Sequence, residues 1–340
     1  MSKAKILLIY TGGTIGMIKD YETGALKAFN FDELLEKIPE LRLLDCEIST
    51  ASFDTVIDSS NMNPTYWNEL CDFIKEGYDI YDGFVVLHGS DTMSYSASAI
   101  SFMLENLSKP VVFTGSQLPI GDLRTDAKEN LITAVQVAAL RKRNKPLITE
   151  VCLYFEYKLY RANRTSKISA ENFEAFTSPN YPELLTSGVH LTINEDALWK
   201  PNKKPLKVHR TLVTEILLLK IYPGISQCLV EGMLNIPCTR GVVLETFGAG
   251  NTSTQPWFVD ALKATIKRGV PVVNITQCIS GSVHMGNYET SVALKKMGVI
   301  NGGDMTTEAA TTKMMYLLGQ ELGPKVFKTV FETSLRGELT

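Results

Sequence analysis

Hydroxyl side chains follow two apolar runs of the sequence, where a strand would end and a loop begin. Thr14 lies in the glycine-rich segment 11–16 (Thr-Gly-Gly-Thr-Ile-Gly), and Ser90 and Asp91 follow the apolar run 84–87. In an open α/β sheet, ligands bind beyond the carboxyl ends of the strands, and glycine lets a backbone approach a ligand closely. The pattern predicts that Thr14 is a nucleophile and that Ser90 faces the same crevice.

The glycine-rich segment does not fit a phosphate-binding loop. A dinucleotide fingerprint needs the order G-x-G-x-x-G, and Thr11 occupies the first of those glycine positions. No G-x-x-x-x-G-K-[ST] run occurs in the sequence. From its spacing alone, Thr14 either carries chemistry or belongs to an ordinary turn.

Lys167 follows a further predicted strand and could serve as a base. A threonine hydroxyl is a poor nucleophile until a base accepts its proton, and a lysine can do so if burial and a neighbour lower its pKa. Together with Ser90 as a relay or water-activating hydroxyl and Asp91 as an orienting charge, Lys167 would form a variant of the serine–lysine arrangement. In the alternative interpretation, Asp91 caps a helix that starts at Thr92, and Lys167 is a solvated surface charge.

The elements that must position these residues follow an alternating order. Short apolar runs alternate with segments of helical period, which is typical of a parallel sheet flanked by helices. The Asn63-Pro64 pair predicts a helix start, and segment 126–140 puts Leu131 and Val135 on one helical face. The predicted strands are 5–11, 83–88, 110–114 and 150–154, followed by 212–221, 241–246 and 271–276. A last helix places Ala310, Met314, Leu317 and Leu318 together.

The length of 340 residues suggests two domains. Residues 194–210 break into Lys, Pro and Asn and keep neither period, so we predict an interdomain linker at 194–211. The expected fold is α/β, with a larger N-terminal catalytic domain (1–193) built on a mostly parallel sheet. A smaller C-terminal α/β domain (212–340) follows.

Composition excludes several classes of function. With 44% apolar residues and a formal charge of −3, the chain offers no basic field for nucleic acid or for an anionic membrane, so we expect a small substrate. The first apolar run is too short for a secretion signal and no apolar run is long enough to span a membrane, which favours a cytoplasmic protein. Six cysteines without a C-x-x-C pair and four histidines without H-E-x-x-H predict no metal.

Further motifs accompany the two hydroxyl segments in order along the chain. They are Asp-Ser-Ser at 58–60, Thr-Gly-Ser-Gln at 114–117, Leu-Tyr-Arg at 159–161 with Asn-Arg-Thr at 163–165, Tyr-Pro-Gly-Ile at 222–225, Thr-Gln-Cys at 276–278 with Ser-Gly at 280–281, and Leu-Arg-Gly-Glu-Leu-Thr at 335–340. With these motifs nearly the whole chain resembles the asparaginase/glutaminase family, and within it the bacterial type I cytoplasmic L-asparaginases.

The resemblance implies hydrolysis of the side-chain amide of L-asparagine to L-aspartate and ammonia, without a cofactor. It implies that Thr14 is the nucleophile, that Ser90 and Asp91 stand at the family's second Thr-Asp pair, and that Lys167 is the catalytic lysine. The residues expected to bind substrate are Asp58, Ser59, Ser60, Gly89, Ser116 and Asn251. Family members are dimers or tetramers, so we expect a homo-oligomer, such as a homotetramer, in which Asn251 reaches across from a neighbouring copy.

Three positions depart from the family pattern. Ser90 replaces the usual threonine and has a less restricted rotamer, so we expect an altered rate more than lost activity. Ala25 occupies the place of a tyrosine that helps activate the nucleophile; Tyr21 or Tyr288 could supply that phenol, and we choose Tyr288. Glu245 stands where some relatives carry an arginine that helps bind a regulatory asparagine beside the position of Cys278. An acidic side chain cannot pair with a carboxylate, so we do not expect that allosteric site.

Segment 17–29 reads either as a plain surface loop or as a lid over the substrate. Two other functions compete with hydrolysis as interpretations of the sequence. An asparaginase-like subunit of a tRNA-dependent amidotransferase normally has an extra domain before the catalytic threonine, whereas ten residues precede Thr11 here. A non-catalytic amino-acid sensor has no need of a base beside two hydroxyls. Glutamine is expected to be the poorer substrate, although one methylene is worth only about 1–3 kcal/mol.

Overall fold

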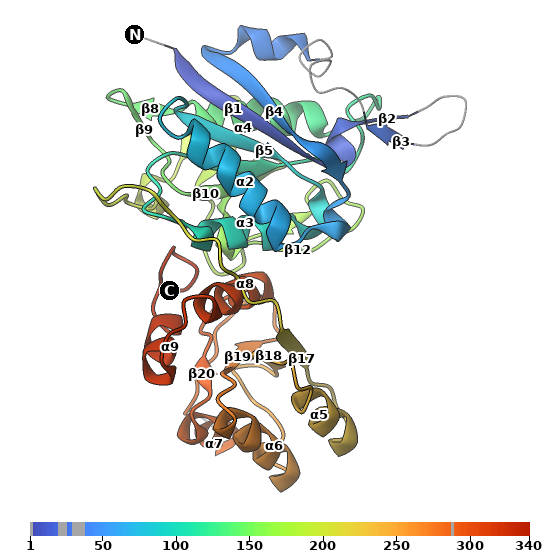
Figure 1. Cartoon of the computed structure of the whole chain (residues 1–340). Coiled ribbons are helices and arrows are strands. Elements are labelled where there is room, and N and C mark those ends of the chain that lie inside the picture. The colour runs from blue at the N-terminus through green and yellow to red at the C-terminus, as the bar shows by residue number, and fades with distance from the viewer. Residues whose placement is uncertain (1–2, 20–25, 29–37, 287–288) are drawn as a thin grey trace. The chain divides into compact units, whose positions relative to one another are not determined.

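The structure is a computed structural model that describes residues 3–19, 26–28, 38–286 and 289–340 (Figure 1). It divides into two compact units, Met1–His209 and Arg210–Thr340, and each is described by itself. The predicted linker 194–211 stays a proposal. Within that segment the structure has the 3-10 turn η6 (Glu195–Ala197) and the short strand β16 (Lys207–Val208), which pairs with β6 (Leu104–Glu105).

A mixed, mostly parallel sheet forms the centre of the first unit, as the sequence predicts. Among the described residues it has eight strands in the order β15-β14-β11-β10-β7-β5-β1-β4. Strands β4, β1, β5, β7 and β10 pair in parallel, and β11, β14 and β15 continue the sheet antiparallel. Their bounds are β1 (Ala4–Gly12), β4 (Cys46–Ile57), β5 (Gly83–Leu87), β7 (Val111–Thr114), β10 (Val151–Phe155), β11 (Lys158–Arg161), β14 (Leu185–Ser187) and β15 (Leu191–Ile193).

The central strands are apolar because helices cover both faces of a parallel sheet. Every residue of β5, β7 and β10 is buried. The four strands predicted in this unit are confirmed, and each begins and ends within one residue of its expected bounds. An apolar run of this length is therefore a sufficient signal for a buried strand.

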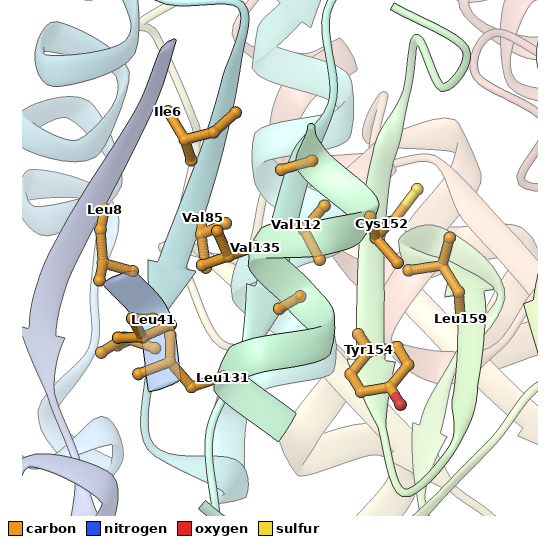
Figure 2. Close-up of a cluster of buried hydrophobic side chains, with 14 of the residues drawn as sticks. Ile6, Leu8, Leu41, Val85, Val112, Leu131, Val135, Cys152, Tyr154 and Leu159 are labelled. Carbon is orange, nitrogen blue, oxygen red and sulfur yellow. The ribbon is translucent and has the colours of Figure 1, made fainter. Parts of the chain in front are cut away.

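Three α-helices of the described part pack on this sheet: α2 (Pro64–Gly77), α3 (Met93–Met103) and α4 (Ala127–Ala138). Helix α2 begins as predicted, because the Asn63 side chain accepts a hydrogen bond from the Thr65 N–H at 2.9 Å and Pro64 occupies the first turn. Helix α4 turns Leu131 and Val135 toward the sheet, where they join Val85 in one buried cluster (Figure 2).

Short elements complete the unit and lie mostly at strand ends. They are the 3-10 turns η1 (Thr14–Gly16), η2 (Pro39–Leu43), η3 (Ser59–Asn61), η4 (Ser90–Thr92) and η5 (Ala162–Arg164), and the strand pairs β2 (Met17–Lys19) with β3 (Leu26–Ala28), β8 (Arg141–Lys142) with β9 (Lys145–Pro146), and β12 (Ser166–Lys167) with β13 (Phe176–Thr177). Segment 17–29 is not a plain loop throughout, because β2 and β3 pair antiparallel within it.

The second unit is the smaller α/β domain that the sequence predicts. Its sheet, in the described part, has the parallel order β17-β18-β19-β20. The elements are β17 (Ile216–Lys220), α5 (Gln227–Leu234), β18 (Gly241–Thr246), α6 (Pro256–Lys267), β19 (Val272–Thr276), α7 (Glu289–Met297), β20 (Ile300–Asn301), α8 (Thr307–Leu318) and α9 (Pro324–Phe331). The strand predicted from residue 212 begins only at Ile216, whereas β18 has the predicted bounds.

Helix α8 contributes a buried charge to the second unit. The predicted last helix is present, and its residues Ala310, Met314 and Leu317 are buried, whereas Leu318 is half-buried. Between them, fully buried Lys313 pairs with Glu338 and donates to the Phe331 and Thr333 carbonyls at 2.7 Å. No helix of the described residues is both long enough and apolar enough to cross a membrane.

Candidate active site

The carboxyl ends of β1, β4 and β5 meet so closely that two positions of β1 and its turn admit only glycine. Gly12 and Gly13 have φ values of 130° and 90°, which favour glycine. A Cβ atom on Gly12 would lie 2.0 Å from the Ile57 carbonyl oxygen, and one on Gly13 would lie 2.5 Å from the Cα and N atoms of Gly89. Thr14 is therefore held next to the loop that follows β5.

A second close contact joins that loop to the end of β4. A Cβ atom on Gly89 would lie 2.6 Å from the Ser59 Oγ. Thr92 Oγ1 donates a hydrogen bond to the Ser59 carbonyl oxygen at 2.7 Å, and Ser59 is buried. The structure thus brings the segments that carry Thr14, Ser59 and Gly89 together at one edge of the sheet.

Lys167 reaches this edge from β12. Its Nζ donates to the Ser90 Oγ at 2.8 Å and to the Asp91 Oδ1 at 2.7 Å. The Lys167 side chain is only 16% exposed, whereas that of Asp91 is 68% exposed. The structure does not support the alternative interpretation, because helix α3 has Thr92 at its N-cap without a side-chain capping bond, and Lys167 is not a solvated charge.

The segment that carries Lys167 is itself anchored in the core. Thr165 is fully buried, and its Oγ1 lies 3.0 Å from the Ser94 Oγ of α3 and 2.7 Å from the Ala162 carbonyl oxygen. Lys167 stands opposite Phe176 in the β12–β13 pair. These contacts fix the backbone from which the lysine extends.

The Asp58 carboxylate is held in its ionised form by its own loop. Asp58 Oδ1 accepts hydrogen bonds from the Ser60 N–H and from the Ser60 hydroxyl, both at 2.8 Å. These two bonds, the backbone one above all, hold the pKa of Asp58 below its usual range. Asp58 and Ser60 are exposed, so a negative charge is available to a ligand at neutral pH.

The loop after β7 carries the predicted residue Ser116 and a neighbour, Gln117, that was not among the predicted site residues. Ser116 is buried and donates its hydroxyl to the Leu118 carbonyl at 2.6 Å, within its own loop. The next residue, Gln117, accepts a hydrogen bond from the Ser90 Oγ through its Oε1 at 3.2 Å. The position of Gln117 at a third strand-to-loop junction is the signal that could have identified this residue.

His88 fixes the peptide group that precedes Ser90. Its ring is fully buried, and Nδ1 lies 2.7 Å from the Gly89 carbonyl oxygen. Burial lowers the pKa of His88 to about 4, so the ring is neutral at pH 7 and Nδ1–H donates to that carbonyl, which can only accept. In a trans peptide the Ser90 N–H then points the opposite way from the Gly89 oxygen.

Two other predicted residues, Tyr288 and Asn251, do not belong to the first unit. Tyr288, like Tyr21 and Ala25, lies outside the described residues. Asn251 belongs to the second unit, where its N–H donates to the Phe247 carbonyl at 2.8 Å. In the described part of the chain, no three His, Cys, Asp or Glu side chains converge so that they could hold a metal ion.

Glu245 is engaged within the second unit. It is buried, its Oε1 accepts a hydrogen bond from the Thr307 hydroxyl at 2.5 Å, and its Oε2 lies 3.6 Å from the Lys220 Nζ. Cys278 is exposed. The carboxylate of Glu245 therefore has a partner at the start of α8 and a cation beside it.

Comparison with known proteins gives consistent matches over both units. Residues 5–199 match the family model "Asparaginase, N-terminal", and residues 215–331 match "Glutaminase/Asparaginase C-terminal domain". The chain is 43% identical over 341 residues to L-asparaginase 1 of Escherichia coli (strain K12), covering 100% of this chain and 99% of that protein.

Solved structures extend the similarity to the fold. The crystal structure of L-asparaginase I from Vibrio cholerae superposes with a TM-score of 0.91 at 42% identity, over 99% of each chain. The probable cytoplasmic L-asparaginase from Campylobacter jejuni gives a TM-score of 0.78 at 25% identity, over 98% of this chain and 100% of that one. These matches show that the chain has the fold of the L-asparaginases.

Proposed function

The chain belongs to the asparaginase family of amidohydrolases, and from that premise we propose that it hydrolyses the side-chain amide of L-asparagine to L-aspartate and ammonia. The observation that carries the proposal is the position of Lys167, whose Nζ lies 2.8 Å from the Ser90 hydroxyl and 2.7 Å from Asp91. A lysine held between a hydroxyl and a carboxylate, beside a second hydroxyl in a glycine-lined turn, suits nucleophilic acyl transfer.

In the proposed reaction, the Thr14 Oγ attacks the amide carbon of asparagine. The Thr14 proton passes through the Ser90 hydroxyl to the Lys167 Nζ, and Asp91 orients the lysine. Lys167 then returns the proton to the amide nitrogen as the C–N bond breaks and ammonia leaves. Water hydrolyses the resulting aspartyl ester on Thr14 by the same route in reverse.

Backbone N–H groups stabilise the oxyanion in this scheme. The hydrogen bond from His88 to the Gly89 carbonyl turns the Ser90 N–H away from the ring, and the N–H groups near Ser116 follow the adjacent strand. A donor aimed at a developing oxyanion contributes about 2.7–4 kcal/mol to catalysis. We assign the Ser90 N–H to this role because its orientation is set before substrate arrives.

Substrate binding in the proposal uses the charged ends of the amino acid. Asp58, ionised and exposed, receives the α-ammonium group, and Ser59, with the N–H of Gly89, receives the α-carboxylate. Ser60 contributes to the substrate site by holding the Asp58 carboxylate through two hydrogen bonds. A phenol from Tyr288 assists Thr14, and Asn251 of a second copy completes the pocket. Glutamine, longer by one methylene, is the poorer substrate.

Several properties of the whole protein belong to the same proposal. We assign it to the cytoplasm, in line with the name of the Campylobacter jejuni relative, and to a homo-oligomer, either a dimer or a tetramer. Glu245 disfavours a regulatory carboxylate ligand, because its own carboxylate already bonds Thr307 and would repel a second anion.

The first test is ammonia release by the purified protein with L-asparagine and with L-glutamine, beside Thr14→Ala and Thr14→Ser. We expect turnover of asparagine to disappear in Thr14→Ala and to persist at a reduced rate in Thr14→Ser, which keeps a hydroxyl. Absence of turnover by the unaltered protein, while asparagine raises its melting temperature, would identify a sensor instead. Copurification with a tRNA-binding partner would identify an amidotransferase subunit.

A further inference from the structure

We propose that Gln117 is a positioning residue that holds the Ser90 hydroxyl against Lys167. The inference rests on the proposed function, because it concerns how the hydroxyl of that site is kept in place. Ser90 Oγ donates to the Gln117 Oε1 at 3.2 Å and accepts from the Lys167 Nζ at 2.8 Å. Two partners, one in the loop after β7 and one in strand β12, thus fix one small side chain.

The orientation of the Gln117 amide is set by its other end. Its Nε2 donates to the Asn172 carbonyl oxygen at 3.0 Å. A carbonyl can only accept, so the NH2 group must face Asn172 and the Oε1 atom must face Ser90. Gln117 therefore presents an acceptor, and only an acceptor, to the serine hydroxyl.

The hydroxyl proton of Ser90 follows from this arrangement. A lysine ammonium has three donors and no acceptor, so in that form Lys167 donates to the Ser90 Oγ and the hydroxyl proton turns to Gln117. One lone pair of Oγ then remains for an incoming donor such as the hydroxyl of Thr14. When Lys167 is neutral, the same proton can turn to Nζ without moving Oγ.

The backbone of Gln117 is anchored by a buried carboxylate. Asp126 is 6% exposed, and its two oxygens accept from the Gln117 N–H at 2.9 and 3.1 Å and from the Leu118 N–H at 3.1 Å. Asn130 Nδ2 adds a hydrogen bond to the Asp126 Oδ2 at 3.2 Å and another to the Gly115 carbonyl at 3.0 Å. Replacing only the side chain of Gln117 leaves these anchors in place.

The restraint matters here because residue 90 is serine. A β-branched threonine is stiff about its χ1 bond, whereas serine has no methyl group to limit its rotamers. Gln117 supplies by hydrogen bonding the restraint that a methyl group would supply by sterics. The two devices are therefore interchangeable, and their effects on rate should not add.

A double-mutant cycle between Gln117→Met and Ser90→Thr tests this coupling. Methionine keeps the length of the side chain and removes its acceptor. We expect Gln117→Met alone to lower kcat for asparagine about tenfold with KM within about twofold, and the same change in the Ser90→Thr protein to lower kcat only about two- to threefold. Gln136→Leu, which changes an exposed glutamine of α4, should leave both constants unchanged.

Two results would overturn the inference. One is an unchanged kcat in Gln117→Met; the other is an equal loss of kcat from this change whether residue 90 carries the methyl group or not. Thermal unfolding of each variant excludes a folding defect, and Gln117→Ala replaces Gln117→Met in the cycle if the methionine variant is unfolded. Failure of the proposed function is distinct, since the unaltered protein would then release no ammonia from asparagine.

Discussion

His88 is buried, so the folded protein disfavours the protonated form of its ring. Burial lowers its pKa from 6.5 to about 4, so between these values the unfolded chain binds a proton that the folded chain does not. Stability is therefore complete above pH 6.5 and falls as pH drops toward 4. The shift corresponds to about 3 kcal/mol.

We expect the free energy of unfolding of the unaltered protein, measured with urea, to fall by this amount between pH 6.5 and 4. In His88→Asn the fall over the same pH range should be smaller by about 3 kcal/mol. Asparagine keeps a donor near the position of the Nδ1 atom but does not titrate. The same substitution at exposed His190 should leave the pH dependence as it is. An identical pH dependence in the unaltered protein and in His88→Asn would contradict the assignment.

Asp58 makes a prediction about substrate affinity. Its pKa lies below the usual range because Ser60 donates two hydrogen bonds to it, so the carboxylate stays ionised from pH 7 to 5. We expect Asp58→Asn to raise KM for asparagine by roughly 10- to 100-fold, the range for a hydrogen bond to a charged group.

Steady-state kinetics at pH 7 and 5 measure the KM of Asp58→Asn and the pH dependence of KM in the unaltered protein. The control is Asp54→Asn, an exposed carboxylate of β4, which should leave KM unchanged. A KM that rises steeply in the unaltered protein between pH 7 and 5, with a slope that Asp58→Asn removes, would mean that Asp58 titrates in the ordinary range.

At the scale of elements, the hairpin between β10 and β11 places two non-glycine residues at positive φ. Glu156 and Tyr157 form its two-residue turn with φ values of 43° and 68°, the region that type I′ turns reserve for Asn and Gly. Tyr157 is 52% exposed, so its side chain contributes little to a core.

We expect Tyr157→Gly to raise the free energy of unfolding by about 1 kcal/mol relative to Tyr157→Ala. Both variants lose the same aromatic ring, but only glycine relieves the positive φ. Chemical denaturation of the pair measures the difference. Equal stability of the two variants would show that the turn adjusts its backbone without cost.

The same scale shows which elements could be predicted. Apolar runs identified β5, β7 and β18 because burial on both faces leaves no alternation of residue types. The strands β14 and β15 escaped prediction, since three-residue strands are defined by their pairing partners and not by a period of their own. The pair β2 and β3 escaped for the same reason.

The candidate site was predictable where glycine marks a close approach of two backbones, as at Thr14 and Ser90. The role proposed for Gln117 could not be predicted, although this residue ends the Thr-Gly-Ser-Gln motif at 114–117. That role depends on a hydrogen bond to a residue 27 positions away. Sequence spacing also could not orient the His88 ring or show the β12–β13 pairing that carries Lys167. Such contacts exist only once the strands have been ordered in the sheet.

At the scale of the whole molecule, the second unit contains an ion pair that is shielded from solvent. Lys313 and Glu338 are both fully buried, and Glu338 also accepts from the Leu335 and Arg336 N–H groups. Glu338→Gln leaves the lysine charge without its counterion, which costs about 3–5 kcal/mol.

We expect hydrogen exchange in Glu338→Gln to accelerate in 210–340 and to stay unchanged in 3–209. The control is Asp260→Asn, which breaks an exposed pair with Lys263 and should change stability by less than about 1 kcal/mol. Uniform acceleration over both units would show that they unfold as one.

The central place of β1 has a consequence for the protein's synthesis. Strand β1 lies between β4 and β5, and β5 begins only at Gly83. At about 5–20 residues per second, a ribosome completes this neighbour several seconds after β1. During that interval the backbone N–H and C=O groups along the β5 edge of the strand have no ladder partner, and such an unpaired edge can pair with another chain. The segment bearing Lys167 emerges later still, but before any of residues 210–340, so the nascent chain can assemble Thr14, Ser90 and Lys167 while the second unit has yet to be translated.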